Sequence, residues 1–213
     1  MPRPVNLARR QTLAREAFAL MRQSPQGLTM TELASRLGLK RPTLYYYFHD
    51  TAAITEAAMG DLLTRQQAHL VGQLVGRYHP VDFLDAWVEA VRTFYAANPS
   101  DIGLFASILA RADASTESPL ASRLAQHQRP VHELAVRTLH DGLARGLVET
   151  CEPEAVVALV AATIDGALLA WHAAGRDPEQ SFGALWALAL APLRIPRLAA
   201  TEGPEAAAED GQG

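Results

Sequence analysis

The chain has 213 residues, which is enough for one large domain or for a small domain joined to a larger one. Its net charge of −4 is unevenly distributed: residues 1–50 hold eight Lys and Arg against three Asp and Glu, a net +5, and the rest of the chain sums to −9. A basic first quarter on an acidic body is typical of proteins that contact nucleic acid at one end, and the single Cys151 excludes a disulfide framework.

The first predicted helix spans residues 7–24 and follows a short basic arm. Its apolar residues recur at intervals of three and four, so one face can be buried while the arginines stay outside. Arg9 and Arg10 lie on that outer face, where they either reach a DNA phosphate or remain solvated. No apolar signal core follows the arm, and a cytoplasmic location is expected.

Residues 28–51 are the most informative stretch of the sequence. An apolar stripe that includes Leu33 and Leu37 predicts a short helix, and Gly38 follows it as a residue that can adopt the left-handed turn conformation. A second short helix begins three residues later, with Pro42 in its first turn. Two short helices joined by a glycine turn predict a helix-turn-helix, whose second helix can enter the major groove of DNA.

The second of these helices has an unusual surface. Leu44 and Phe48 are four residues apart and can share its buried side. Cations, a hydroxyl and phenol groups then remain outside, and such groups suit phosphates and base edges. A plain helical hairpin with a tyrosine-rich core is the alternative interpretation.

Residues 28–51 contain a series of short motifs: Thr31, Leu33-Ala34, Gly38-Leu39, Thr43-Leu44-Tyr45 and Tyr47-Phe48. With these motifs the stretch resembles the DNA-binding helices of the TetR family of one-component regulators. The likeness in motif covers about residues 9–62, and beyond them it is one of helix pattern only. Thr51 departs from the pattern, because the family has a lysine there that contacts a DNA phosphate; a hydroxyl at a helix N-terminus can make this contact more weakly.

The resemblance implies a set of DNA contacts. We expect Arg41 and Thr43 to read base edges, and Pro42 and Tyr46 to contact thymine methyl groups. The expected phosphate contacts are Thr31, Lys40, Tyr45, Tyr47 and Thr51.

The remaining predicted helices are separated by proline and glycine signals. The first of them is capped by Thr51 and is long enough to link the N-terminal part to the body and to carry a ligand signal. In the fourth, Pro130 predicts a kink or a break near Gln128, and Gly142 and Gly146 are expected to end the helix. The predicted ranges are 52–77, 81–97, 102–112, 119–145, 155–174 and 182–191.

Three histidines, His127, His132 and His140, fall in one of these helices. Their spacings of five and eight residues do not place a metal-binding pair on one helix face, and no carboxylate completes a set. No metal site is therefore expected, and the histidines are interpreted as surface or pocket-rim residues.

Residues 155–174 are nearly all apolar and long enough to cross a membrane. Asp165 at their centre would cost roughly 2.5–3.5 kcal/mol on insertion scales, which argues against a membrane span. Together with residues 182–191 they predict a helical hairpin whose outer face is covered by a second copy of the chain in a four-helix bundle, as is usual for TetR-like proteins. The expected dimer contacts are Leu159, Thr163, Gly166, Ala167 and Trp186.

The resemblance also implies a small-molecule effector, because the body of TetR-family proteins binds one in a central cavity. Few charges lie on the central helices, so a largely apolar or aromatic effector is expected. No catalytic motif, phosphate loop or zinc spacing is visible, so neither an enzyme nor a cofactor is expected. The candidate effector contacts, each of which can also be a core residue, are Trp87, Phe94, Phe105, His127 and Trp171.

We therefore interpret the chain as all-α, with about nine helices. Residues 1–50 would form a three-helix helix-turn-helix domain, residues 51–198 a helical effector-binding and dimerisation domain, and residues 199–213 a disordered tail. The expected function is a cytoplasmic transcriptional repressor that binds a palindromic site in double-stranded DNA as a homodimer and is released by a small molecule. An activator, or a ligand-binding or interaction protein without sequence-specific DNA readout, is the alternative.

Overall fold

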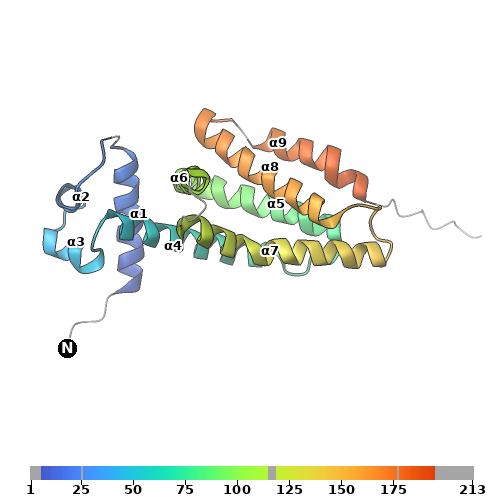
Figure 1. Cartoon of the computed structure of the whole chain (residues 1–213), viewed down its shortest axis with the longest axis horizontal. Helices are drawn as coiled ribbons and strands as arrows, with labels where there is room; N and C mark the ends of the chain where they lie inside the picture. The colour runs from blue at the N-terminus through green and yellow to red at the C-terminus, as the bar shows by residue number, and fades with distance from the viewer. Residues whose placement is uncertain (1–5, 25, 115–118, 177, 195–213) are drawn as a thin grey trace, which may run out of the picture.

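The computed structural model describes residues 6–24, 26–114, 119–176 and 178–194. In these residues the regular structure is helical, apart from one isolated antiparallel bridge between Val148 and Arg194. The all-α prediction is confirmed. A small head and a larger helical body are joined by one long helix (Figure 1), and the predicted tail lies outside the described residues.

The head is built by three helices that pack against the beginning of a fourth. Its core is formed by small and apolar side chains at helical spacing, among them the buried Leu13, Leu33, Leu44 and Ile54. The long helix therefore contributes to the head as well as to the body. The helices of the head are α1 (Leu7–Arg22), α2 (Met30–Arg36) and α3 (Arg41–Tyr47), and the long helix is α4 (Thr51–Leu74).

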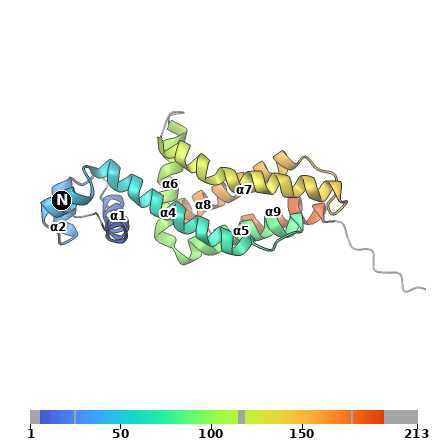
Figure 2. The same cartoon turned by 90° about the horizontal axis from the view of Figure 1, so that it is seen from below.

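The body packs against the second half of α4, which runs along one side of the bundle (Figure 2). Proline opens four of its helices, where a missing N–H costs no hydrogen bond. The last helix continues into a π-helical turn and a 3₁₀ turn. The elements are α5 (Pro80–Ala97), α6 (Pro99–Ala114), α7 (Pro119–Ala144), α8 (Pro153–Ala174), α9 (Glu179–Leu185), the π turn Trp186–Leu190 and the 3₁₀ turn Ala191–Leu193.

Two helix starts differ from the predictions. Asp50, and not Thr51, caps α4, since its Oδ1 accepts a hydrogen bond of 2.7 Å from the backbone N–H of Ala53. Thr29, and not Thr31, precedes α2, and it forms a reciprocal capping box with Glu32. In both cases the cap is the residue whose side chain can reach the third backbone N–H of the helix.

The course of α7 contradicts a break near Gln128, leaving the predicted kink untested, and it contradicts a helix end at Gly142. The helix runs without a break through Pro130, and Gly142 lies inside it. A Cβ at residue 142 would lie 2.3 Å from Cγ of Pro80, so this glycine allows α7 to approach the start of α5 closely. Gly146, with a φ of 62°, ends the helix as predicted.

Candidate nucleic-acid interface and effector cavity

A glycine turn sets the angle between the two helices of the candidate DNA-binding motif. Gly38 has a φ of 66°, its N–H donates to the carbonyl of Ser35, and the N–H of Leu39 donates to the carbonyl of Ala34. This is the Schellman arrangement, which satisfies the last carbonyls of α2 and needs a left-handed residue at position 38. Leu39 is half-buried and packs against the core, so the turn is held from both sides.

α3 is anchored on one side and open on the other. Leu44 and Phe48 are buried in the head, as their spacing predicted. The opposite face holds cations, a hydroxyl and phenol rings, and no carboxylate. Its exposed residues are Lys40, Arg41, Pro42, Thr43, Tyr45 and Tyr46, and Thr31 on α2 is exposed as well.

Aromatic contacts order the side chains on this face. The guanidinium carbon of Arg41 lies 5.3 Å from the centroid of the Tyr45 ring, one helical turn away. The rings of Tyr46 and Tyr47 meet edge to face at 5.1 Å, and Tyr47, which is half-buried, also packs beside Phe48. Tyr46 is therefore more open to a ligand than Tyr47.

Arg10 on α1 supports the end of α3. Its Nε donates to the carbonyl of Tyr47 at 3.4 Å, and its guanidinium lies over the ring of Phe48 at 5.1 Å. These contacts hold Arg10 against the protein in this structure. Arg9 is exposed, so it is the better placed of the two for a flanking phosphate.

The start of α4 lies next in the chain after α3. Thr51 is half-buried at its first position, Asp50 caps it, and Nε2 of His49 lies 3.3 Å from Oδ2 of Asp50. The start of α4 therefore holds the carboxylate of Asp50 and the hydroxyl of Thr51, whereas TetR-family proteins have a lysine at the position of Thr51. The backbone N–H groups of the first turn are the remaining anion-binding groups here.

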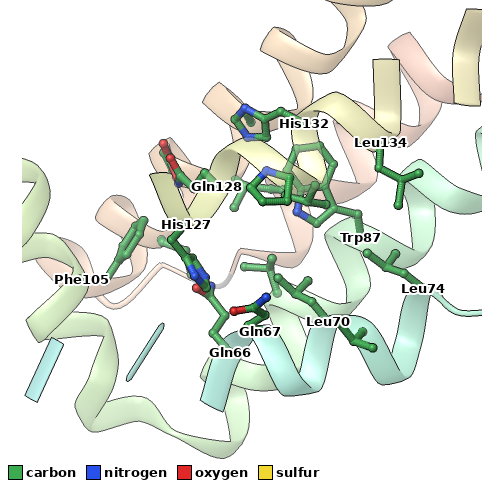
Figure 3. Close-up of a pocket in the computed structure, with 18 of the residues that line it drawn as sticks. Gln66, Gln67, Leu70, Leu74, Trp87, Phe105, His127, Gln128, His132 and Leu134 are labelled. Atoms are coloured by element: carbon green, nitrogen blue, oxygen red, sulfur yellow. The ribbon is translucent and has the colours of Figure 1, made fainter. Parts of the chain in front are cut away.

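A cavity of about 350 Å³ lies in the body, between α4, α5, α7 and α8, with Phe105 of α6 at one end (Figure 3). Three of the predicted effector contacts, Trp87, Phe105 and His127, line it. Phe94 and Trp171 do not: Phe94 packs in the core against Tyr95, and Trp171 is half-buried against the core.

Apart from the histidines, sequence reasoning missed the polar residues of the cavity wall. Asp165 lines it from α8, and burial raises the pKa of this carboxyl to about 6. Burial also lowers the pKa of His127 and His132, which favours their neutral forms. The signal for Asp165 was visible, because it is the one Asp, Glu, Lys or Arg among the apolar residues 155–174. The remaining polar residues of the wall are Gln66, Gln67 and Gln128.

The described residues bring together no group of three or more His, Cys, Asp or Glu side chains that could hold a metal ion. Of the three histidines considered, His127 and His132 line the cavity, whereas His140 is exposed and lies 3.3 Å from Glu154.

α8 is the one described helix whose length and composition would allow it to cross a membrane. In the structure it packs against α6, α7 and α9, and its other side is an exposed apolar face. Leu159 on this face is 49% exposed, and Leu188, beyond α9, is 81% exposed. Gly166 is also exposed, with no side chain near it.

The other predicted dimer contacts are less exposed to solvent. Thr163 and Trp186 are half-buried, and the guanidinium of Arg194 lies over the Trp186 ring at 5.8 Å. Ala167 is 4% exposed and packs into the protomer, so it lies off the exposed face of α8.

Four charged side chains connect the head to the body, and we call them the junction network: Arg15, Asp61, Arg65 and Asp101. Asp61 of α4 is buried, and its Oδ2 lies 3.5 Å from Nε of Arg15 in α1 and 2.8 Å from Nε of Arg65. Nη1 of Arg65 lies 2.7 Å from Asp101 in the first turn of α6. The network thus joins α1, α4 and α6.

Comparisons with known proteins agree with this architecture. The model of a family described as bacterial regulatory proteins, tetR family, matches residues 13–58, which span the glycine turn and α3. Among curated proteins, no sequence matches the chain.

Three solved structures show the extent of the likeness in fold. A TetR transcriptional regulator from Chloroflexus aurantiacus J-10-fl has a TM-score of 0.72 at 18% identity, over 89% of this chain and 98% of that one. A TetR transcription regulator from Haloarcula marismortui has a TM-score of 0.72 at 18% identity, over 88% and 100%. The ketosteroid transcriptional regulator KstR2 of Mycobacterium tuberculosis has a TM-score of 0.67 at 15% identity, over 90% and 97%. Residues 13–58 are thus similar to the tetR family of bacterial regulatory proteins, and the chain as a whole shares the fold of solved TetR-family regulators.

Proposed function

We propose that the protein is a homodimeric repressor that binds a palindromic operator through α3 and leaves it when a small effector fills the body cavity. The observation that carries the proposal is the outer face of α3. It presents Lys40, Arg41 and Thr43 on a short helix that Leu44 and Phe48 fix to the head. In a helix-turn-helix protein these are the positions that meet phosphates and base edges.

The exposed face of α8 and the turn after α9 support a dimer. Leu159 and Leu188 are large apolar side chains open to water, and Gly166 lets a partner backbone approach closely. A second copy of the same face would bury them in a four-helix bundle about a two-fold axis. A dimer presents two copies of α3, and a two-fold protein matches a palindromic site.

The path of α4 supports control by an effector. Gln66, Leu70 and Leu74 of this helix line the cavity, while Ile54 and Ala58 of the same helix lie in the core of the head. A ligand that binds one position of α4 better than another would therefore shift the position of the head. Such a regulator acts on DNA and is expected in the cytoplasm.

The test is selection of bound sequences from random duplex DNA by the purified protein at near-physiological salt. Enrichment of a palindrome with half-sites about one helical turn apart would support a dimeric, sequence-specific reader. Salt-sensitive binding without enrichment would contradict the proposal and favour a protein that no longer reads a specific site. Transcription from a promoter that carries the selected site, in the presence and absence of the protein, separates a repressor from an activator.

A further inference from the structure

We infer that the body cavity recognises a monocation: a ligand with an apolar body whose ammonium group pairs with the carboxylate of Asp165. This inference deepens the proposed function, because it names the chemical class of the effector. It rests on the proposed function only for the step from ligand binding to release of DNA.

The first observation is the isolation of Asp165. Its carboxyl lines the cavity in the middle of α8, and within the described residues it forms no ion pair and no hydrogen bond. Arg65 of α4 is already engaged by Asp61 and Asp101. A carboxylate in apolar surroundings without a partner is costly, and a bound cation would remove that cost.

The second observation is the charge of the rest of the wall. Among the described residues that line the cavity, Asp165 alone has a formal charge at neutral pH, since His127 and His132 are held towards their neutral forms by burial. An anionic ligand would therefore meet a carboxylate and no cation. A neutral ligand would fill the apolar space but leave Asp165 unpaired. Anionic and neutral ligands should therefore bind more weakly than a cation.

The third observation is the apolar part of the cavity wall. It includes the aromatic rings of Trp87 and Phe105 together with Leu70 and Leu74 (Figure 3), and Ile164 lines the cavity from α8. The volume of the cavity is about 350 Å³. It therefore has room for an apolar ligand body of several carbon atoms beside the ammonium group. Aromatic faces also attract cations and planar apolar groups, so they suit both parts of the ligand.

The experiment compares three probes of equal length: 4-phenylbutylamine, 4-phenylbutanol and 4-phenylbutyrate. Binding to the full-length protein is measured by isothermal titration calorimetry at pH 7.5. The amine should bind at least about tenfold more tightly than the alcohol, and the carboxylate more weakly than both. Asp165→Asn should remove the preference for the amine, whereas Asp165→Glu should keep it. Asp141→Asn, a matched change at an exposed position of α7, should leave the preference unchanged.

Equal binding of amine and alcohol to the wild-type protein would overturn the inference, and so would tighter binding of the carboxylate or no binding of any probe. These outcomes need no variant, so they hold even if a substitution disturbs folding. Release of the selected duplex by the amine is a separate measurement. Selective binding of the amine without release of DNA would support the cation site and contradict effector control, which belongs to the proposed function.

Discussion

Lys40 and Arg41 are adjacent cations at the start of α3, and both are exposed. Arg41 lies over the Tyr45 ring and has a planar group that can bind a guanine edge, whereas Lys40 precedes the helix and carries a point charge. We expect Arg41→Ala to cost about 1–3 kcal/mol of binding and to relax preference at one base position. Lys40→Ala should weaken binding to all sequences and lower the salt slope by about one.

Fluorescence anisotropy distinguishes the effects of Arg41→Ala and Lys40→Ala. It is measured at several salt concentrations with the selected duplex and with single-base variants of that duplex. An equal loss for Arg41→Ala on every duplex would assign Arg41 to a phosphate.

Thr51 is a second residue whose effect is open to test. It stands where the resembling family has a lysine, next to the capping carboxylate of Asp50. A cation at this position would add one phosphate contact, so we expect Thr51→Lys to tighten DNA binding and to steepen the salt slope by about one. Thr64→Lys, which adds the same charge to an exposed position further along α4, is the control. Equal effects of both changes would mean that only net charge matters.

Asp165 should also make stability depend on pH. Burial raises its pKa from 3.8 to about 6. A group whose pKa is raised by folding stabilises the fold below its unfolded pKa, and this contribution is lost as the pH rises through 6. We expect Asp165→Asn to be more stable than the wild type at pH 7.5, on the order of 2 kcal/mol after allowance for water in the cavity, and the advantage to vanish by pH 4.

Urea unfolding of the ligand-free protein at the two pH values measures this difference, with Asp141→Asn as the control. A loss of stability in Asp165→Asn that is the same at both pH values would show that the side chain has a structural role instead.

At the scale of helices, the sequence predicted each α-helix of the described residues, because proline and glycine stand at most of their ends. Pro80, Pro99 and Pro153 open helices, and Gly146 closes one. The prediction failed where a residue type has two structural roles, so that its presence alone does not locate a helix end. Proline also occurs within a long helix that packing holds together, as Pro130 shows, and a glycine such as Gly142 also serves close helix packing.

The junction network links helices of the head and the body through buried charges. Arg65 supplies charge to two buried carboxylates, Asp61 and Asp101, and its own side chain is 27% exposed. Removal of one partner from a buried ion pair leaves the other charge uncompensated. We expect Arg65→Met to lower the free energy of unfolding by about 3 kcal/mol, the low end of the range for buried pairs because water reaches part of the side chain.

The matched control is Arg92→Met, which removes an arginine that pairs with two exposed carboxylates, Glu89 on α5 and Glu179 on α9, and should cost less than about 1 kcal/mol. Urea unfolding at fixed protein concentration measures both variants. Equal costs would mean that the network stabilises the fold no more than an exposed ion pair does.

At the scale of the whole molecule, local patterns predicted the exposed face of α3 better than the lining of the cavity. The face of α3 follows from one helix, since Leu44 and Phe48 alone determine which side is buried. Which residues line the cavity depends on how α4, α5, α7 and α8 are rotated relative to one another. No local sequence pattern contains that information. Aromatic size was therefore a poor guide: Phe94 is a core residue, while Asp165 and Gln66 line the cavity.

The exposed face of α8 leads to the last prediction, which concerns the assembly. Leu159 and Leu188 are exposed on the surface where a second copy would pack. An arginine at either position would place an unpaired charge in a largely apolar interface, so we expect Leu159→Arg and Leu188→Arg to be monomeric at micromolar concentration. Loss of the second head should reduce affinity for the palindromic duplex by on the order of 10²-fold or more, because binding of the two half-sites would no longer be linked.

Sedimentation velocity gives the oligomeric state, anisotropy gives the affinity, and circular dichroism confirms that the helices remain. Tyr78→Arg is the control, since it places the same charge on an exposed aromatic residue in the loop between α4 and α5. The Tyr78→Arg protein should remain dimeric and bind the duplex as tightly as the wild type does. Dimeric Leu159→Arg and Leu188→Arg proteins that keep full affinity would show that the two copies associate through another surface, and the pairing of heads would then have to be derived from that surface.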